Sequence, residues 1–372
     1  MSRLEAETER RKASHIETTM QQDVQFRTKK TGFDDVELVH NAIPGIDRDD
    51  VNLSVDLFGH HMAAPLVIES MTGGTPTAAK LNEILAKAAE KLGIAIGVGS
   101  QRAGIEKPEL AYTYKIVRDN APHALVFANL GAPQLVKGYG LEQMRKAVEM
   151  VKADGLYIHL NSVQECVQVE GEPVFKGAME KIREGAEELG VPVVLKETGS
   201  GFSHETAVAL EKIGVKGVDV AGAGGTSWAA VEYYRAKEKE SPLHERLGET
   251  FWDWGIPTAA SVVEVSRSTQ LTVIASGGVR NGLHGAKAIA LGADAFGLAL
   301  PFLKSTPGGV EEVTRRLEAI LLELRTAMFL TGSKNIAELQ KSPAVIRGPT
   351  REWLLARKFD PDEFAKDRGR RQ

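Results

Sequence analysis

The stretch GLYIHLNSVQE, residues 155–165, joins an apolar run to a dense polar one. Its opening residues suit a strand that is covered on both faces. From His159 to Glu165 the chain then carries an imidazole, two carboxamides, a hydroxyl and a carboxylate. A strand needs much less polar chemistry than this in order to end. We therefore expect this strand end to face a ligand.

Apolar runs with a polar or glycine-rich end occur eight times along the chain. The runs are rich in Val, Ile and Leu and lack strict alternation, as expected for buried parallel strands. Most gaps between them hold one helix, such as the stretch 77–93, which ends at Gly93. The runs begin at Pro65, Ile94, Ala124, Gly155, Pro192, Gly217, Leu271 and Asp294.

Eight β-α units predict an α/β fold of the TIM (β/α)8 barrel type. An open doubly wound sheet is the alternative, and the glycine-rich run ends favour the closed barrel. The long interval from Gly217 to Leu271 predicts an insertion after strand 6. We expect residues 1–60 to form an N-terminal arm and plug, 61–350 the cofactor-binding (β/α)8 barrel and 351–372 a C-terminal tail.

Composition narrows the classes of function. The 372 residues carry a net charge of −4, which gives no reason to expect a nucleic-acid partner. The single cysteine, Cys166, excludes an intrachain disulfide and a cysteine-rich metal site, and it suits a reducing compartment. The N-terminal segment lacks an apolar signal core, and no apolar run approaches the ~18 residues that span a membrane. We expect a soluble, cytoplasmic protein without a membrane partner.

The end of the seventh run, ASGGVRNG, predicts a phosphate site. Its glycines leave backbone N–H groups accessible ahead of a helix, and Arg280 adds a positive charge. Tight turns are the alternative explanation of the glycines. The place after the seventh of eight strands favours phosphate, because barrels commonly bind phosphate there.

Lys196 ends the fifth run and shares the barrel rim with Thr72, Ser100, Asn129 and Thr226. One cation among neutral donors suits a planar heterocycle with carbonyl oxygens, such as a flavin. The alternative is a surface lysine whose ammonium group lies in water.

The polar stretch after the fourth run predicts a second part of the same site. Strand periodicity places His159 and Asn161 on one side, and Gln164 and Glu165 follow in the expected loop. The alternative is that His159 caps a core layer above a solvated loop.

The N-terminal arm holds Arg11, Lys12 and His15 near helical spacing, so one helix face would be cationic. Such a face is commonly just exposed to solvent. If the arm folds over the barrel mouth, the three residues would bind a diphosphate.

Several motifs in this order resemble the type 2 isopentenyl diphosphate isomerases, and the match runs from Arg11 to about Lys334. SQR, HLN..QE and AGGTSW are highly specific in this order. The resemblance implies a flavin-dependent TIM barrel that interconverts isopentenyl and dimethylallyl diphosphate with reduced FMN and Mg²⁺. It also implies NAD(P)H as reductant and a homo-oligomer, a tetramer or an octamer. The motifs are RKASH, MTGG, GVGSQR, ANLGAPQLVKGYG, HLNSVQE, DVAGAGGTSW, WGIPTAAS and ASGGVRNG.

The same resemblance implies residue roles. Glu165 would hold Mg²⁺, and Ser162 stands where the family pattern has proline. The catalytic candidates facing the isoprenoid are His159, Asn161 and Gln164. The substrate-binding set is Arg11, Lys12, His15, Ser100, Arg102 and Gln164. The FMN-binding set is Met71, Thr72, Gly73, Ser100, Asn129, Lys196, Thr226, Gly277, Gly278, Val279, Arg280, Ala299 and Leu300.

Three other functions fit a barrel of this kind. An FMN-dependent hydroxy-acid oxidase or dehydrogenase needs a histidine base near the seventh strand, where the first histidine is His284. A nucleotide dehydrogenase needs a cysteine after the sixth strand, whereas Cys166 lies elsewhere. A flavin-storing or phosphate-binding barrel without activity needs neither the cationic arm nor Glu165.

Overall fold

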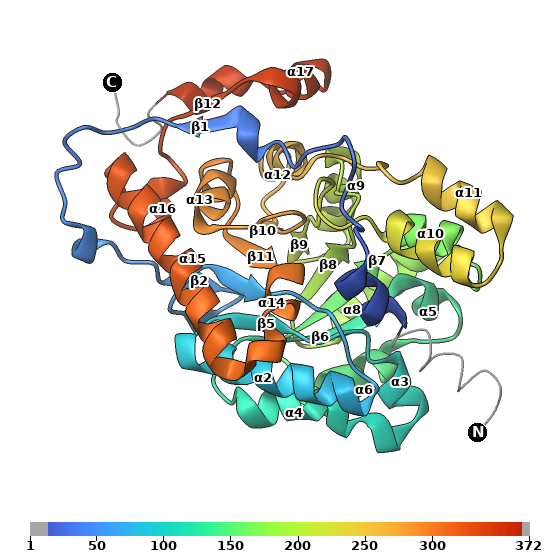
Figure 1. The fold of residues 1–372 in the computed structure, drawn as a ribbon. Coiled ribbons are helices and arrows are strands. Elements are labelled where there is room, and N and C mark those ends of the chain that lie inside the picture. The colour runs from blue at the N-terminus through green and yellow to red at the C-terminus, as the bar shows by residue number, and fades with distance from the viewer. Residues whose placement is uncertain (1–13, 367–372) are drawn as a thin grey trace.

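The computed structural model describes residues 14–366, in which eight parallel strands close into a barrel (Figure 1). The strands follow one another around the barrel in chain order, and the last pairs with the first. The predicted TIM barrel is thus confirmed over the open sheet. The strands are β4 (Leu66–Ile68), β5 (Ala95–Gly97), β6 (Val126–Gly131), β7 (Gly155–Leu160), β8 (Val193–Glu197), β9 (Gly217–Asp219), β10 (Thr272–Ala275) and β11 (Ala295–Leu298).

Helices surround the barrel, and the first shows how local sequence sets their ends. Thr75 caps α2 by accepting a 3.1 Å hydrogen bond from the Ala78 N–H, and Pro76 occupies the first turn. Gly93 ends the helix with φ 61°, in the left-handed region that suits glycine. The helices around the strands are α2 (Pro76–Leu92), α3 (Arg102–Glu106), α4 (Tyr112–Asn120), α5 (Ala132–Val136), α6 (Leu141–Val151), α7 (Ser162–Val167), α8 (Ala178–Glu188), α9 (His204–Lys212), α12 (Thr258–Ser266), α13 (Gly282–Ala290), α14 (Leu300–Leu303), α15 (Gly309–Thr331) and α16 (Ile336–Leu339).

The predicted insertion after the sixth strand forms two extra helices, α10 (Trp228–Glu238) and α11 (Pro242–Thr250). They project from the side of the barrel (Figure 1). Trp252, which follows α11, is buried against Val231 of α10 and Val24 of the N-terminal segment. The insertion is therefore anchored to the segment that precedes the barrel.

A hairpin of β2 (Val55–Leu57) and β3 (His60–Met62) packs against the barrel interior. Phe58 in its turn meets Phe127 of β6 edge to face, with ring centroids 5.9 Å apart. The hairpin covers the end where the strands begin, so the open mouth lies at the end where they finish.

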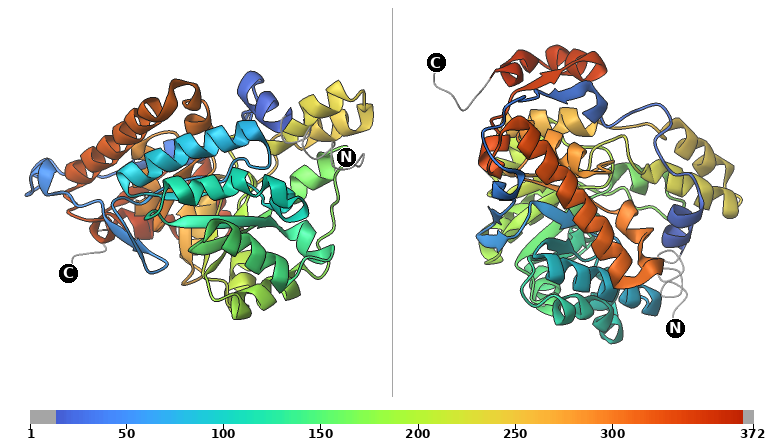
Figure 2. Two further views of the ribbon diagram at one scale, coloured as in Figure 1. Left: turned by 90° about the horizontal axis from the view of Figure 1, so that it is seen from below. Right: turned by 60° about the vertical axis from the view of Figure 1, so that its left-hand side comes forward.

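Outside the barrel, a strand that precedes it in the sequence runs beside one that follows it (Figure 2, right). Strand β1 (Val36–Leu38) pairs antiparallel with β12 (Ala344–Ile346), and α17 (Gly348–Ala356) follows. Earlier in the arm, residues 14–21 form a helix beside α10. There the rings of His15 and Trp228 meet edge to face, with centroids 5.2 Å apart. The arm thus reaches the insertion and the barrel mouth.

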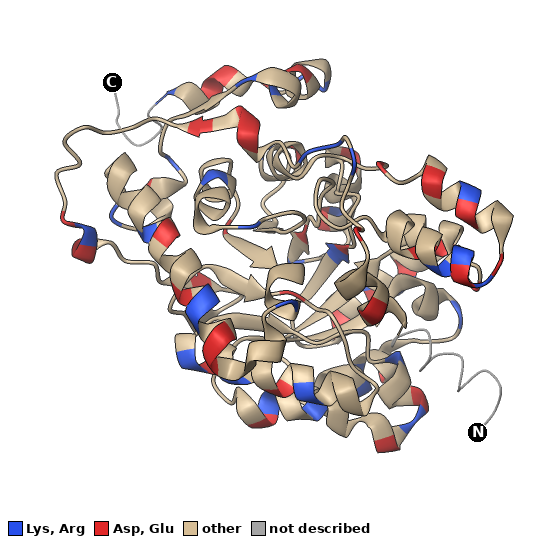
Figure 3. Ribbon diagram, viewed as in Figure 1, with Lys and Arg blue, Asp and Glu red and all other residues tan. Residues whose placement is uncertain are grey.

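Acidic and basic residues alternate over the outer helices, and no broad face of one sign is visible in Figure 3. Among the described residues, no helix combines the length and the apolar character that crossing a bilayer requires.

Candidate active site

The barrel mouth contains two adjoining lobes that open to solvent, with volumes of about 1010 Å³ and 990 Å³ when the open space at the mouth is included. Both are lined by His15 of the arm, Met71 and Thr72 after β4, and Lys196 of β8. Every predicted site residue within residues 14–366 lines at least one lobe. Arg11 and Lys12 lie outside the described residues.

Strand register explains how distant residues reach one level of the mouth. Gly131 pairs with His159, His159 with Lys196, and Lys196 with Asp219. Four consecutive strands thus present one row of positions. A Cβ at Gly131 would lie 2.7 Å from His159 Nε2, so glycine there makes room for the imidazole.

The first lobe includes the glycine-rich turn after β10. Gly277 and Gly278 have φ of 94° and 73°, and a Cβ on Gly277 would lie 2.2 Å from the carbonyl oxygen of Gly222. Glycine is therefore required by conformation and by close backbone packing. The turn leads into α13, which Asn281 caps by accepting a 2.8 Å hydrogen bond from the His284 N–H.

Arg280 supplies positive charge to this lobe. Its guanidinium donates to Gln25 Oε1 at 2.7 Å and to the Val279 carbonyl at 3.1 Å, and within residues 14–366 no carboxylate pairs with it. Burial and, to a lesser degree, Arg316 lower its pKa. A half-buried guanidinium without a carboxylate partner, beside a helix N-terminus, favours an anion.

Lys196 lies in the floor of the mouth with 7% of its surface exposed, which excludes the alternative of a surface lysine. Its Nζ lies 2.5 Å from Asp219 Oδ2 and 2.6 Å from Glu69 Oε2. Burial alone would lower the pKa of Lys196, but the two carboxylates outweigh burial and raise it. The sequence reasoning missed both acids, although each stands out as an acidic residue within or next to an apolar run.

The polar stretch after β7 is helical, whereas we expected Gln164 and Glu165 in a loop: both belong to α7. Asn161, just before this helix, donates through Nδ2 to Glu165 Oε1 at 2.8 Å and to Gln164 Oε1 at 3.3 Å. Ser162 is the first residue of α7. Proline is also well tolerated at a first helical position, so the departure from the family pattern leaves the helix start intact.

Glu232 of α10 is a third residue that sequence reasoning missed. Its Oε1 accepts from Gln164 Nε2 at 3.0 Å and lies 2.8 Å from His15 Nε2, and its Oε2 lies 2.5 Å from Arg235 Nη1. Burial would raise the pKa of Glu232, but His15 and then Arg235 outweigh burial and lower it. The sequence predicts this stretch only as an insertion, and its spacing gives no sign that a glutamate of α10 contacts Gln164.

Two other candidates take part in local contacts around the second lobe. His159 Nδ1 lies 2.7 Å from Asn129 Oδ1, which fixes the imidazole ring. Arg102 donates through Nε to Glu106 Oε1 at 2.8 Å on the same helix. Burial would lower the pKa of Arg102, and Glu106 outweighs burial and raises it.

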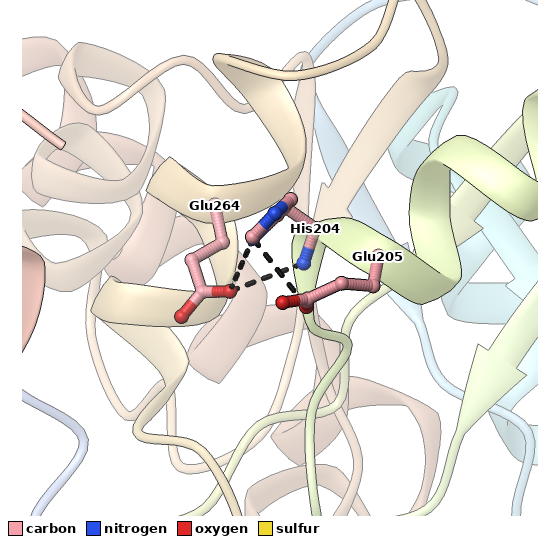
Figure 4. Close-up of side chains that lie close together, drawn as sticks. All are labelled: His204, Glu205 and Glu264. Carbon is pink, nitrogen blue, oxygen red and sulfur yellow. Dashed lines mark hydrogen bonds and ion pairs between the residues drawn. The ribbon is translucent and has the colours of Figure 1, made fainter. Parts of the chain in front are cut away.

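A separate cluster of possible metal ligands lies away from the mouth, at His204, Glu205 and Glu264 (Figure 4). The Arg357 guanidinium contacts all three side chains of this cluster. It lies 2.6 Å from Glu205, 3.1 Å from Glu264 and 2.9 Å from His204 Nδ1. Trp353 also donates to the fully buried Glu264 at 2.8 Å. The cluster therefore anchors α17 to the barrel.

Comparison with known proteins assigns the family. The family model described as FMN-dependent dehydrogenase matches residues 5–109 and 135–346. The chain belongs to this family. The isopentenyl-diphosphate delta-isomerase of Methanothermobacter thermautotrophicus is 49% identical over 356 residues, which are 96% of this chain and 98% of that protein. The protein of the same name from Pyrococcus furiosus is 47% identical and covers 97% of this chain and 92% of its own. Within its family the chain is an enzyme of the isopentenyl-diphosphate delta-isomerase group, as the sequence motifs predicted.

Solved structures add support for the fold alone. A flavocytochrome b2 variant with sulfite bound has a TM-score of 0.64 at 19% identity and covers 88% of this chain and 81% of that one. A lactate oxidase from Pediococcus acidilactici has a TM-score of 0.64 at 15% identity, with 90% and 87% covered.

Proposed function

We propose that this enzyme interconverts isopentenyl diphosphate and dimethylallyl diphosphate for isoprenoid biosynthesis, using reduced FMN and Mg²⁺. The observation that carries the proposal is the pair of adjoining lobes. One lobe has a glycine turn and a cation that suit a cofactor with a phosphate group. The other lobe has the carboxamides and the carboxylate of the polar stretch. The similarity of almost the whole chain to isopentenyl-diphosphate delta-isomerases supports it.

The hydroxy-acid oxidase alternative is disfavoured by His284. This histidine packs against Phe33 with ring centroids 5.4 Å apart, and it lines neither lobe. Burial lowers the pKa of His284 most, and the positive charge of Lys287 lowers it further. An oxidase of this fold needs a base that touches the substrate, and this half-buried side chain lies outside both lobes.

FMN fits the first lobe. Besides the Arg280 cation, Ser70 lines both lobes, and its buried Oγ has no hydrogen-bond partner among residues 14–366. A buried polar group without a partner is costly, so a polar ligand there would be stabilising. Bound and reduced, FMN would supply a ring group able to carry a proton next to the alkene. The proposed FMN contacts in the first lobe are Met71, Thr72, Lys196, Thr226, Ala299, Leu300 and the turn 277–280, and those in the adjoining second lobe are Gly73, Ser100 and Asn129.

Mg²⁺ and the substrate diphosphate fit the second lobe. Glu165 is the only carboxylate among the described residues that line this lobe. Asn161 and the Glu172 N–H, which donates at 2.7 Å, fix its two oxygens. Mg²⁺ prefers oxygen ligands and usually bridges one or two carboxylates to phosphates. We assign the diphosphate itself to Arg11, Lys12, His15, Ser100 and Arg102.

The isomerisation adds a proton at one carbon and removes a proton two carbons away. Gln164, held by Glu232 and Asn161, would orient the alkene, with His159 and Asn161 beside it. A carboxamide stays neutral at working pH, so its part is to orient or relay a proton by hydrogen bonding. NAD(P)H would reduce the flavin without net consumption in each turnover. The enzyme would work as a homo-oligomer.

The test is proton NMR of isopentenyl diphosphate incubated anaerobically with the purified enzyme, FMN, Mg²⁺ and NAD(P)H. We expect dimethylallyl diphosphate to accumulate to equilibrium, with NAD(P)H consumed only in proportion to flavin. Omission of the reductant should abolish conversion. Absence of conversion, combined with FMN binding, would support flavin storage instead. Stoichiometric oxidation of an added 2-hydroxy acid would support the oxidase.

A further inference from the structure

A group of buried polar side chains forms the floor below the first lobe. Glu69 follows β4, Tyr157 is on β7, Lys196 on β8, Asp219 on β9, and Ser276 follows β10. Lys196 and Ser276 both contact Asp219, at 2.5 Å in each case. The family resemblance assigned Lys196 to the flavin, but neither acid nor Tyr157 has a part in the reaction derived above.

Neighbouring strands make room for this group. A Cβ at Gly297 of β11 would lie only 1.6 Å from Glu69 Oε1, so a side chain at this position would displace the carboxyl group. On β5, a Cβ at Gly97 would lie 2.3 Å from Ser70 Oγ and 3.1 Å from the Tyr157 ring. The acids are thus built into the barrel, and Glu69 depends on glycine in the adjoining strand.

The charges of the floor do not balance when every group is ionised. Glu69 and Asp219 would carry two negative charges against one positive charge on Lys196. Burial, then Glu69 and Asp219, raises the pKa of Tyr157 well above its ordinary value, so Tyr157 is neutral. The strands that flank Glu69, β5 and β11, contain no titratable side chain. A buried net charge of −1 would be strongly unfavourable.

Glu69 is the acid that relieves this imbalance. Asp219 accepts from both Lys196 Nζ and Ser276 Oγ, so each of its carboxylate oxygens has a donor. Glu69 Oε1 has no hydrogen-bond partner within residues 14–366. Burial, followed by repulsion from Asp219, raises the pKa of Glu69 to about 8, although Lys196 opposes the change.

We propose that Glu69 is a positioning residue that keeps its proton in the working enzyme, so that Lys196 and Asp219 form a neutral pair below the flavin. The inference rests on the proposed function, because it needs FMN above Lys196. Reduction adds negative charge to the flavin, and a second ionised carboxyl in the floor would oppose it. A neutral Glu69 therefore keeps the reduced cofactor accessible near neutral pH.

The ionisation of Glu69 should change the reduced fraction of bound FMN in one direction as the pH rises. Glu69 is neutral below its folded-state pKa and becomes charged as the pH rises through it. The ratio of reduced to oxidised FMN, at a fixed potential, should then fall by an extra factor on the order of tenfold above about pH 8. This fall adds to the pH dependence that the flavin itself shows.

The experiment measures the reduced fraction of bound FMN against a reference dye between pH 6 and pH 10, in the holoenzyme. Glu69→Gln keeps the shape and removes the titration, so we expect the wild-type ratio at pH 7 and no extra fall above pH 8. Glu205→Gln, a carboxyl group away from the mouth, is the matched control and should behave as wild type. A tenfold rise of the ratio in Glu69→Gln at pH 7 would overturn the proposal, as would an extra fall that persists in this variant.

Lys196→Ala separates this inference from the proposed function. If FMN retention and the reduced fraction are both unchanged in Lys196→Ala, the lysine does not contact the flavin and the proposed cofactor geometry fails. If Lys196→Ala lowers the reduced fraction while Glu69→Gln retains the extra fall, only the present inference fails. Should Glu69→Gln not fold, infrared spectroscopy of the unchanged holoenzyme gives the same decision. A protonated-carboxyl band must be present at pH 7 and disappear on raising the pH, and its absence at pH 7 would overturn the proposal.

Discussion

Replacing Gln164 with asparagine tests the second lobe most directly. Gln164 Nε2 donates to Glu232 Oε1 at 3.0 Å, and asparagine is shorter by one methylene, roughly 1.5 Å. The gap would widen to about 4.5 Å, which is beyond hydrogen-bond reach. Glu232 keeps its contacts to His15 and Arg235, so the fold should be preserved.

The expected cost is large in rate and small in binding. A misplacement of about 1 Å near the reacting atoms can cost about a hundredfold, or about 2.7 kcal/mol of activation free energy. The proposed diphosphate contacts lie on other residues, so KM should change little. A lower kcat with nearly constant KM is the signature of a contact that matters in the transition state, provided that chemistry limits the rate.

The assay is steady-state isomerisation under reduced FMN and saturating Mg²⁺. Gln340→Asn is the matched control, because Gln340 donates to the Ala293 carbonyl at 3.0 Å and lines neither lobe. The control should retain wild-type kcat. A wild-type kcat in Gln164→Asn would refute the reasoning, and a raised KM with constant kcat would reassign Gln164 to substrate binding.

Three further changes test other parts of the molecule. Glu165→Gln should raise the Mg²⁺ concentration needed for half-maximal rate while FMN still binds, and an unaltered Mg²⁺ titration would remove Glu165 from the metal site. Deletion of residues 1–16 removes the contact of His15 with Glu232, so KM should rise while the protein stays folded and yellow; an unchanged KM would make the arm dispensable. Arg357→Ala leaves the buried Glu264 short of donors and should cost about 1–3 kcal/mol of unfolding free energy by denaturant titration, with KM constant. Unaltered stability would show that the contacts of Arg357 with Glu205 and Glu264 do not stabilise the fold.

The barrel could be predicted from sequence because its signals are local. Each strand is a short apolar run, and the stop of α2 at Gly93 is a left-handed cap that only glycine adopts readily. The secondary structure of the polar stretch was predicted wrongly, as a loop. Residues 162–167 form fewer than two helical turns, too short to show a helical period in sequence.

The missed residues are those whose role depends on contacts across the barrel. Glu69 and Asp219 are far apart in sequence, and only the closure of the barrel brings both to Lys196. Glu232 reaches Gln164 because α10 packs against α7. The sequence pattern of α10 does not encode that direction, which is set by packing of Trp252 and Val24 on the insertion.

The fold cannot decide the chemistry, because barrels that align with most of this chain include oxidases of 2-hydroxy acids. The floor and the glycine turn would serve any reaction that needs a bound flavin. The second lobe is different, since it carries the polar stretch of α7, which elements outside the eight-fold repeat hold in place. His15 of the arm and Gln164 of α7 both contact Oε1 of Glu232, which belongs to the insertion. The specific reaction therefore depends on these added elements, and this is why loss of the arm should harm substrate binding and leave the flavin in place.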